Sequence, residues 1–457
     1  MNDAYERTAD ARERGRQHRK DVPRRRLGEF QQSARDGVDI LIEQNSSRLP
    51  DLVPLRFARM LTDPFGFYRG TAALMAADLA ASPSSGLDVI SCGDAHLSNF
   101  GVYASPEREL VFDLNDFDEA STAPWEWDVK RLITSVVIGA RQAGHDQQAV
   151  RGAAREAADR YVDGLGVVMG LSVIERHYLH AQPELVADRL PVGMQQVIER
   201  TAQRARRRTS RRAAKRLTEL DADGQPRFLD DPPVLTHVSD QVIQQVRAAY
   251  QEYLHSVEPD IALLLRHFRI CDIARRVVGV GSVGTRCFLV LLKGPSDEPL
   301  VLQIKQAQTS VLQNYGRQHS PKTTSWVLSE LGEGARVVAL QKMLQATSDP
   351  FLGYLRAVDQ HYYVRQFHDM KGSIEVEGMD RETFTSYAGS CATLLARAHA
   401  QSPNAAAVLG YIGSGDRVNQ AIVDFSEAYA DKSQRDFEEL QAAAAAGRIE
   451  VAADPAR

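Results

Sequence analysis

Two short loops in the first third of the chain hold residue types that suit phosphoryl transfer. The string GDAHLSNFG at 93–101 follows the strand-like VISC and places Asp94 and Asn99 five residues apart. In that chemistry a carboxylate accepts the proton of the attacking hydroxyl, and a carboxamide a few residues later ligates the metal on the phosphates. The spacing predicts Asp94 as a catalytic base and Asn99 as a metal ligand. His96 either orients the base or stiffens the loop.

The second loop, VFDLNDFDEA at 111–120, follows a predicted strand directly. Carboxylates at a strand end can hold Mg²⁺ through one or two oxygens, while water and phosphate fill the other positions. The loop therefore predicts Asp116 and Asp118 as metal ligands together with Asn99. For Asp118, as for Asp113, capping of a turn is the structural alternative.

A glycine-rich string, GVGSVG at 279–284, stands between the strand-like runs RRVV and CFLVLL. G-x-G-x-x-G alone is a weak signal because it also opens dinucleotide-binding folds. Between two strands, however, it indicates a hairpin folded over phosphates rather than a strand-to-helix turn. Lys305 ends a second apolar strand 21 residues after Gly284, where its charge can reach the α- and β-phosphates. The pattern predicts nucleotide binding by Gly279, Gly281, Gly284 and Lys305.

The elements that must position these loops follow from hydrophobic periodicity. Apolar spacing near three or four predicts helices throughout 127–265, and again at 380–400 and 416–445. Strand-like runs return only after 265, as an antiparallel set with glycine-rich turns. We expect five units: an N-terminal arm and helix at 1–60, the catalytic-loop and metal-motif part of a helical lobe at 61–150, a helical insertion at 151–265, a glycine-rich nucleotide lobe at 266–372, and C-terminal helices at 373–457.

Composition excludes several classes of protein. Of the 457 residues, 43% are hydrophobic and 25% charged, which indicates an ordinary folded chain. Because 55 basic residues oppose 60 acidic ones, no global charge attracts nucleic acid or anionic lipid. The exception is a run at 200–216 with nine Lys or Arg residues, which could meet RNA or an acidic partner. Without interleaved aromatic residues, a solvated helix face is favoured there.

The apolar stretches of the sequence are too short for a membrane-spanning segment. CFLVLL at 287–292 is far shorter than the roughly 20 residues that cross a bilayer, and the charged first thirty residues contain no signal-like apolar run. The four cysteines are scattered, with no C-x-x-C pair, which indicates reduced thiols. We expect a cytoplasmic protein with no membrane partner.

Together, GDAHLSN and NDFD resemble the protein-kinase-like superfamily, and more closely its aminoglycoside- and choline-kinase-like branch. That branch has a G-D-x-H-x-x-N catalytic loop and an I-D-F-D-like metal motif. The resemblance implies an α+β, two-lobed kinase-like fold, with a large helical lobe and a smaller antiparallel-sheet nucleotide lobe, and the cofactors ATP and Mg²⁺. It also implies that Asp128, in PWEWDVKRL, braces the catalytic loop, and that Asp369 and Met370 lie beside adenine.

The order of the motifs departs from the superfamily. The catalytic and metal motifs lie about 180 residues before the glycine-rich hairpin, the reverse of ordinary kinases. In the branch named above, a helix ending in an L-A-R-x-H-like string leads into the catalytic loop, whereas here LLARAHA ends at 400. A circular permutation would reconcile the two orders.

Over nearly its whole length the chain also is identified as a member of a bacterial family known as domain of unknown function 2252. The similarity rests on long strings, which are GRQHRKDVPR, LVPLRFARMLTDPFGFYRG, GDAHLSNFG, FDLNDFDEA, PWEWDVKRL, SDPFLGYL and YYVRQFHDMKGS. The family implies no substrate.

The partner of the lysine is a second departure. Kinases pair this lysine with a helix glutamate, but Gln313 and Ala339 stand where an acid is expected, which leaves Glu330 and Glu333. The pairing acid is therefore unassigned.

Several functions fit these residues. The first is an ATP- and Mg²⁺-dependent phosphotransferase that acts on a hydroxyl of a small molecule or protein, with AMP transfer as a variant. The second is a nucleotide-binding pseudokinase, and the third is a metal-dependent hydrolase built on His96 and the aspartates. Arg69 and Arg365 fit phosphate contacts or ordinary salt bridges equally well. The acceptor and the oligomeric state are open.

Overall fold

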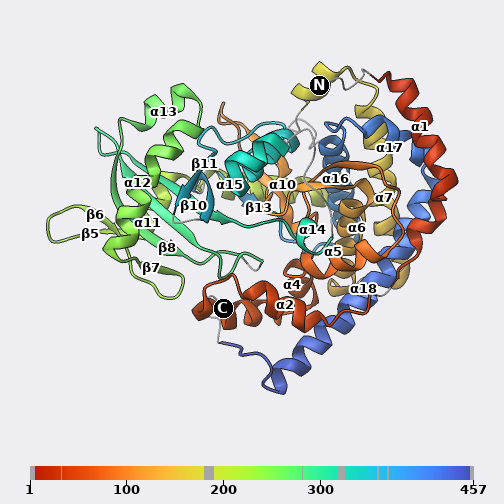
Figure 1. The fold of residues 1–457 in the computed structure, drawn as a ribbon, viewed down its shortest axis with the longest axis horizontal. Helices are drawn as coiled ribbons and strands as arrows, with labels where there is room; N and C mark the ends of the chain where they lie inside the picture. The colour runs from red at the N-terminus through yellow and green to blue at the C-terminus, as the bar shows by residue number, and fades with distance from the viewer. Residues whose placement is uncertain are drawn as a thin grey trace.

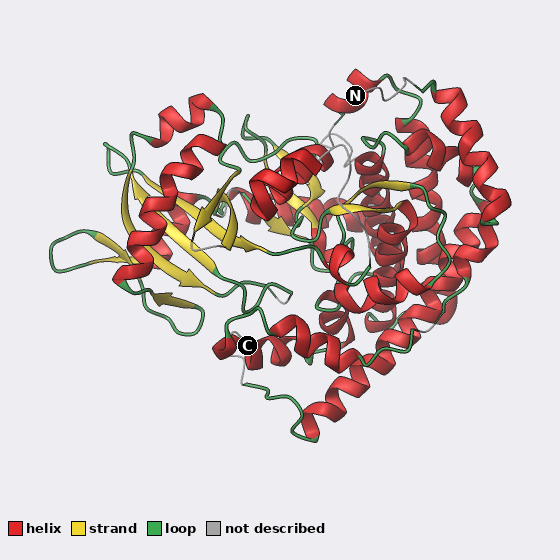
Figure 2. Cartoon of the chain, viewed as in Figure 1, coloured by secondary structure: helices red, strands yellow, loops and turns green. Residues whose placement is uncertain are grey.

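The fold is mixed α/β with antiparallel sheets. The computed structural model describes residues 6–31, 33–179, 190–279, 281–316, 325–357, 360–367 and 370–452, with side chains omitted at 325–330. Figure 1 shows a β-rich part, drawn mostly in green, beside a larger helical part that contains both the red start and the blue end of the chain. The same division is clear when helices and strands are coloured separately (Figure 2).

A six-stranded antiparallel sheet organises the β-rich part. Its strand order is β11 (Gly353–Ala357), β12 (Gln360–Gln366), β10 (Pro299–Ala307), β9 (Cys287–Lys293), β8 (Arg269–Arg276) and β7 (Leu235–His237). The predicted antiparallel set after 265 is confirmed. Alternate side chains of these strands face opposite sides of the sheet. Leu302 packs toward α12 (Asp240–Ser256), whereas Val301 packs toward α11 (Ser210–Leu217).

One buried helix lies at the centre of the helical part. α6 (Trp125–Gln142) is buried on every side from Trp125 to Ala140, as expected for a helix enclosed by others. The helices described around it and over the sheet are α1 (Thr8–Asp21), α2 (Gly37–Asn45), α3 (Val53–Met60), α4 (Pro64–Arg69), α5 (Ala72–Ala81), α7 (Gln147–Val168), α8 (Val173–Tyr178), α10 (Val192–Arg206), α13 (Pro259–Leu265), α14 (Val311–Asn314), α15 (Ser325–Leu344), α16 (Arg381–His399), α17 (Ala405–Ile412) and α18 (Asp416–Ala445). The helices expected at 380–400 and 416–445 are confirmed.

The two ends of the chain pack together in the helical part (Figure 1). α1 lies against α17 so closely that a Cβ added at Gly15 would fall 1.8 Å from the carbonyl oxygen of Ala407. Only glycine permits that approach of two backbones. Farther along, Arg35 forms buried ion pairs with Asp78 of α5 and Asp436 of α18.

Two small antiparallel ladders hold the loops that the sequence singles out. β1 (Asp88–Ser91) pairs with β4 (Ser121–Pro124). β2 (Phe100–Ala104) lies between β3 (Leu110–Leu114) and β13 (Gly372–Ser373). Because β1 and β2 flank residues 92–99, and β3 and β4 flank 115–120, both loops emerge at one place.

The expectation that 127–265 is helical throughout is wrong. β5 (Thr218–Leu220) and β6 (Pro226–Phe228) form a hairpin, and β7 joins the edge of the six-stranded sheet. Each strand has only three residues, too few for a period of two to appear in the sequence. The second half of the expected helical insertion therefore belongs to the β-rich part, where α12 also packs.

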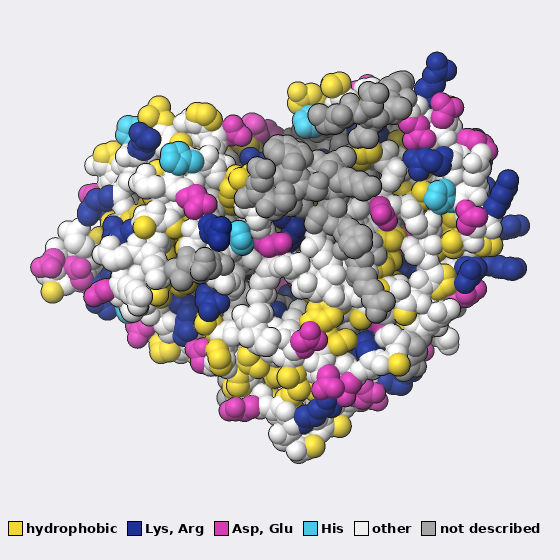
Figure 3. Space-filling view, in the orientation of Figure 1, with side chains coloured by type: hydrophobic (Ala, Val, Ile, Leu, Met, Phe, Trp, Pro, Cys, Tyr) yellow, Lys and Arg dark blue, Asp and Glu magenta, His cyan; other side chains and the backbone are white. Residues whose placement is uncertain are grey.

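The surface carries both signs of charge. Figure 3 shows acidic and basic side chains interspersed over one face, in keeping with the small net charge of −5. In the run at 200–216 the basic side chains are exposed, whereas Ala202, Ala205, Ala213 and Ala214 are buried. This arrangement matches a solvated helix face. Among the described helices, none combines the length and apolarity needed to span a membrane.

Candidate active site

The loop that contains Asp94 is held from below by α6. The carboxylate of Asp128 accepts hydrogen bonds from the backbone N–H of Cys92 at 2.8 Å and of Gly93 at 3.0 Å, and lies 3.2 Å from His399 Nε2. Burial alone would raise the pKa of Asp128, but His399 and these donors outweigh it and lower the pKa. Asp128 therefore holds the start of the loop that contains Asp94.

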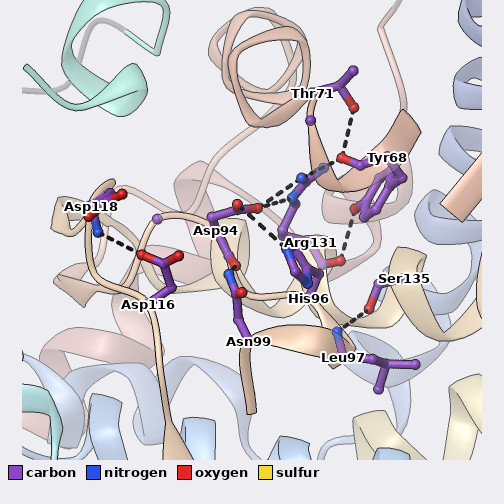
Figure 4. A network of polar contacts seen from close by, with 12 residues as sticks. Tyr68, Thr71, Asp94, His96, Leu97, Asn99, Asp116, Asp118, Arg131 and Ser135 are labelled. Atoms are coloured by element: carbon purple, nitrogen blue, oxygen red, sulfur yellow. Dashed lines mark hydrogen bonds and ion pairs between the residues drawn. The ribbon is translucent and has the colours of Figure 1, made fainter. Parts of the chain in front are cut away.

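Asp94 is anchored through one oxygen only. Its Oδ1 accepts hydrogen bonds from Arg131 Nε at 2.9 Å and Nη2 at 2.8 Å, while Oδ2 lies 3.6 Å from His96 Nε2 (Figure 4). Burial raises the pKa of Asp94 to about 6, although Arg131 acts in the opposite direction. Burial also keeps the pKa of His96 well below its ordinary value, so the imidazole is neutral near pH 7. The arrangement leaves Oδ2 of Asp94 as an acceptor toward the cavity.

The loop at 92–99, which contains Asp94, contacts the loop at 115–120, which we call the aspartate loop. Asn99 Nδ2 donates to the carbonyl oxygen of Asp94 at 2.7 Å, and the Asn99 carbonyl accepts from the N–H of Asn115 at 2.8 Å. Gly93 has a φ of +81°, and a Cβ there would fall 2.0 Å from the carbonyl oxygen of Glu119. Gly93 thus lets the two loops approach closely.

Asp116 and Asp118 lie near three basic side chains, of which Lys305 and Arg365 belong to the six-stranded sheet and Lys371 precedes β13. Asp118 forms an ion pair with Lys305 and accepts a hydrogen bond from the Tyr363 hydroxyl at 2.7 Å. Burial would raise the pKa of Asp116, but Lys305, Arg365 and Lys371 together lower it. Asp116 is therefore a carboxylate at neutral pH.

The glycine-rich segment forms the hairpin loop between β8 and β9, as its sequence predicts. Gly279 and Gly284 have φ values of +68° and +88°. Gly279 and Gly281 line the space above the aspartate loop. The carbonyl oxygen of Gly284 instead accepts from Leu49 N at 2.8 Å, which turns this glycine toward the N-terminal part.

Two adjoining cavities lie between the sheet and the loops. The first, of about 110 Å³, is lined by residues that include Asp94, His96 and Asn99. The second, of about 350 Å³, is lined by Lys305 and by Arg365, Gln366 and Phe367 at the end of β12. Asp116, Gly279 and Ser282 line both cavities. Asp94, Asp116, Asp118 and Lys305 thus meet at one cleft, although 187 positions separate Asp118 from Lys305.

The donor set fits a magnesium ion that takes most of its ligands from elsewhere. The described side chains contain no group of three or more His, Cys, Asp or Glu residues arranged around a metal position. Mg²⁺ in phosphoryl-transfer sites binds one or two protein oxygens and completes its shell with phosphates and water. Asp116 and the amide oxygen of Asn99 supply that minimum. Asp118 is engaged by Lys305 and Tyr363.

Met370 and Glu333 do not line the cleft. Asp369 is outside the described residues. Met370, with a φ of +46°, donates its backbone N–H to the carbonyl oxygen of Arg208 at 2.7 Å and does not line either cavity. Of the two candidate acids for Lys305, Glu333 pairs with Arg336 at 2.5 Å, and the side chain of Glu330 is not described.

Several site residues escaped the sequence prediction. Arg131 follows Asp128 by three positions, and Ser135, which accepts the N–H of Leu97 at 3.1 Å, follows Arg131 by four. Residues three or four positions apart share one face of a helix. In a helix that is otherwise apolar, such polar residues indicate a face that contacts polar groups, and this pattern could have identified Arg131 and Ser135 from the sequence. Lys371 and Arg336 offered no such local signal. Burial lowers the pKa of Lys371 to about 7, and Arg336 donates to the carbonyl oxygens of Asp118 and Gln308.

The family model described as an uncharacterized protein conserved in bacteria (DUF2252) matches residues 48–443. The chain belongs to this family. The DUF2252 match includes the loop that contains Asp94, the aspartate loop, the glycine-rich hairpin and Lys305. Comparison with curated proteins and with solved structures finds no match.

Proposed function

We propose that this DUF2252 protein is an ATP- and Mg²⁺-dependent phosphotransferase with a circularly permuted, kinase-like, two-lobed fold. The observation that carries the proposal is the cleft itself. It brings Asp94, Asp116 and Asp118 of one part of the chain against Lys305 and the glycine-rich hairpin of another. In phosphoryl transfer these groups supply positioning and charge neutralisation, which account for most of the catalysis.

The β-rich part supports a role as the nucleotide lobe. The glycine-rich loop joins two antiparallel strands, Lys305 lies on the next strand, and α14 and then α15 follow that strand. Lys305, Arg365 and Lys371 surround the second cavity with basic groups, in a place where a polyphosphate would reach them. Phe367, at the end of β12, supplies an apolar side chain for a base.

The contact between α16 and β1 supports the permutation. Just beyond α16, the Ser402 hydroxyl accepts the N–H of Ile90 at 2.8 Å, and Asn404 Nδ2 donates to the carbonyl oxygen of Asp88 at 2.9 Å. The end of the LLARAHA helix therefore lies beside the strand that enters the catalytic loop. In an ordinary kinase order these two segments would be consecutive, whereas here some 300 positions separate them.

In the proposed reaction, the γ-phosphoryl group passes from ATP to the acceptor hydroxyl. The acceptor hydroxyl oxygen bonds to the γ-phosphorus, the bond from that phosphorus to the β,γ-bridging oxygen breaks, and ADP leaves with the electron pair. The hydroxyl proton passes to Oδ2 of Asp94, whose Oδ1 Arg131 keeps in place. Lys305 and the backbone of the glycine-rich loop hold the nucleotide.

Asp116 and Asn99 would hold magnesium, which neutralises charge on the β- and γ-phosphate oxygens. Lys305 forms an ion pair with Asp118. When phosphates bind, we expect Lys305 to divide its contacts between them and Asp118.

Binding and turnover of three variants test the proposal. We expect Mg²⁺–ATP to raise the melting temperature of the full chain, because a ligand of the folded state stabilises it by mass action. Lys305→Met and Asp116→Asn should each weaken that binding at least tenfold. Asp94→Asn should still bind Mg²⁺–ATP but lose about 10²–10⁴-fold in ADP formation with a pool of hydroxyl compounds. Lys293→Met, on the neighbouring strand β9 and paired with exposed Asp297, is the matched control.

The products decide between the alternatives. ADP supports phosphoryl transfer, whereas AMP transfer would release pyrophosphate. Binding without either product would identify a pseudokinase. Absence of a thermal shift at millimolar Mg²⁺–ATP would overturn the proposal, as would ATP-independent hydrolysis of phosphoesters that Lys305→Met leaves intact.

A further inference from the structure

Three arginines from the N-terminal part of the chain line the first cavity. Arg48 precedes α3, Arg56 lies within α3 and Arg69 ends α4. They face the same space as Asp94 and the glycine-rich hairpin. None of them takes part in the reaction described above.

Two of these arginines are buried among neutral oxygens. Arg56 is 0% exposed, and it donates to Asn45 Oδ1 at 2.6 Å, Gln44 Oε1 at 2.7 Å and the Gly70 carbonyl at 3.1 Å. Arg48 donates to the carbonyl oxygen of Val283 at 2.5 Å. Burial lowers the pKa of both guanidinium groups, and Arg48 lowers that of Arg56 further. Their mutual repulsion and desolvation are costs that a purely structural role leaves unexplained.

Arg69 is the most available of the three. Its Nε, like the Nε atoms of Arg48 and Arg56, is buried without a hydrogen-bond partner among the described residues. Burial lowers the pKa of Arg69, while Asp94 and Asp116 act in the opposite direction. Buried donors that lack partners are rare in folded proteins and are expected where a ligand completes the site.

The carboxylates of the cavity do not neutralise this group fully. Asp94 is bound by Arg131, and Asp118 by Lys305. Glu119 accepts the backbone N–H of Val311 at 2.7 Å. These three carboxylates therefore have partners other than the three arginines.

The three arginines line a different cavity from Lys305. Lys305, Arg365 and Lys371 belong to the second cavity, and the three N-terminal arginines belong to the first. Asp94 lies on the first side as well, so the hydroxyl that loses its proton to Asp94 must enter there. On the basis of the proposed function, we infer that the acceptor is a small hydroxyl compound carrying a phosphate or carboxylate, which Arg48, Arg56 and Arg69 bind.

Anion binding to the nucleotide-loaded protein tests this inference. The probes are inorganic phosphate and malonate, titrated by calorimetry into the full chain with Mg²⁺ and a saturating non-hydrolysable ATP analogue, which occupies the proposed nucleotide site. We expect saturable binding of at least one anion, weakened at least tenfold by Arg69→Gln, with analogue affinity unchanged within twofold. Because Arg69 Nε has no hydrogen-bond partner among the described residues, Arg69→Gln breaks no hydrogen bond of that atom. Arg26→Gln, at an exposed position, is the control.

Acceptor preference gives a second readout. ADP formation is compared for glycerol, glycerol 3-phosphate and glycerate, which share a skeleton and differ in charge. A preference for either anionic compound that Arg69→Gln abolishes supports the inference and says which anion is favoured. Equal use of the three compounds would contradict it.

Failure of the inference and failure of the proposed function can be told apart. The inference is overturned if the analogue binds but neither anion does, if Arg69→Gln binds both anions as the wild type does, or if Arg69→Gln weakens the analogue alone. If the analogue itself does not bind, the proposed function fails. In that case the anion titrations are repeated on the free protein, where Arg69→Gln and Arg365→Gln assign any binding to the first or second cavity.

Discussion

At the scale of single residues, the proposed role of Asp94 as a general base predicts how activity depends on pH. Burial raises its pKa to about 6, against the opposing effect of Arg131. A general base must be ionised, so kcat/KM should fall about tenfold per pH unit below pH 6 and level off above it. A pH series of ADP formation between pH 5 and 8 measures this, with the affinity for Mg²⁺–ATP followed in parallel. A flat profile would remove Asp94 from the role of base.

The same raised pKa makes Asp94 costly to the fold. An unfolded aspartate has a pKa near 4, so between about pH 4 and 6 the folded state binds more protons, and its stability falls as pH rises. Asp94→Asn stays neutral and should raise the free energy of unfolding at pH 7 by about 1–3 kcal/mol, while ADP formation falls about 10²–10⁴-fold. The gain should vanish near pH 4. Urea titrations at both pH values measure it, and Asp297→Asn, at a surface ion pair, should show neither effect.

At the scale of elements, α6 holds the loop that contains Asp94 through hydrogen bonds to Asp128. Asp128→Ala would leave the N–H groups of Cys92 and Gly93 buried without an acceptor, which we expect to cost about 2–4 kcal/mol. The folded-state pKa of Asp128 is lowered, so its contribution is present above about pH 4 and is lost as pH falls through the folded-state pKa.

Chemical denaturation at pH 7 and pH 3 checks this prediction. The matched control is Asp146→Ala, which removes an exposed N-cap carboxylate of α7 and should cost about 1 kcal/mol. Equal losses for the two variants would mean that the bracing contacts contribute nothing beyond an ordinary cap.

Local signals explain what the sequence predicts well. Each of the three motifs is contained in about ten consecutive residues, so it can be recognised locally. The structure brings to one cleft Asp94 and Asn99, the aspartates after β3, and Gly279 and Gly281. The antiparallel order of β8, β9 and β10 follows from their short apolar runs and turns. Their roles in binding and catalysis remain proposals.

Long-range contacts explain what the sequence does not predict. Arg48 and Arg56 enter the cavity from the N-terminal part through packing that no local pattern encodes. The ion pair of Asp118 with Lys305 joins positions 187 apart, so neither residue could be assigned its partner from spacing. The three-residue strands between 218 and 237 are stabilised by the hairpin and by the edge of the sheet, which again is a tertiary effect.

At the scale of the whole molecule, a buried ionic cluster fastens the start of the chain to its end. Arg35 Nη2 lies 2.6 Å from Asp78 Oδ2 and 2.7 Å from Asp436 Oδ2, and Lys432 also pairs with Asp436. Arg35→Met would leave two carboxylates buried with too little compensation, at a cost of about 3–5 kcal/mol. Thermal unfolding measures the loss. Arg141→Met, which breaks the exposed pair with Asp431, should shift the melting temperature little.

Because the cleft lies between the two parts of the molecule, we expect a ligand bound there to order segments of both parts. Residues 92–99 and 115–119 belong to the helical part, and 281–286 to the β-rich part, so one ligand between them must order all three segments together. Hydrogen exchange with and without Mg²⁺ and an ATP analogue should therefore show protection in all three at the same ligand concentration. α7, which lines neither cavity, serves as the internal control. Protection confined to one part would mean that the nucleotide does not contact both sides of the cleft. This result would contradict joint binding of the nucleotide by Lys305 and the aspartates.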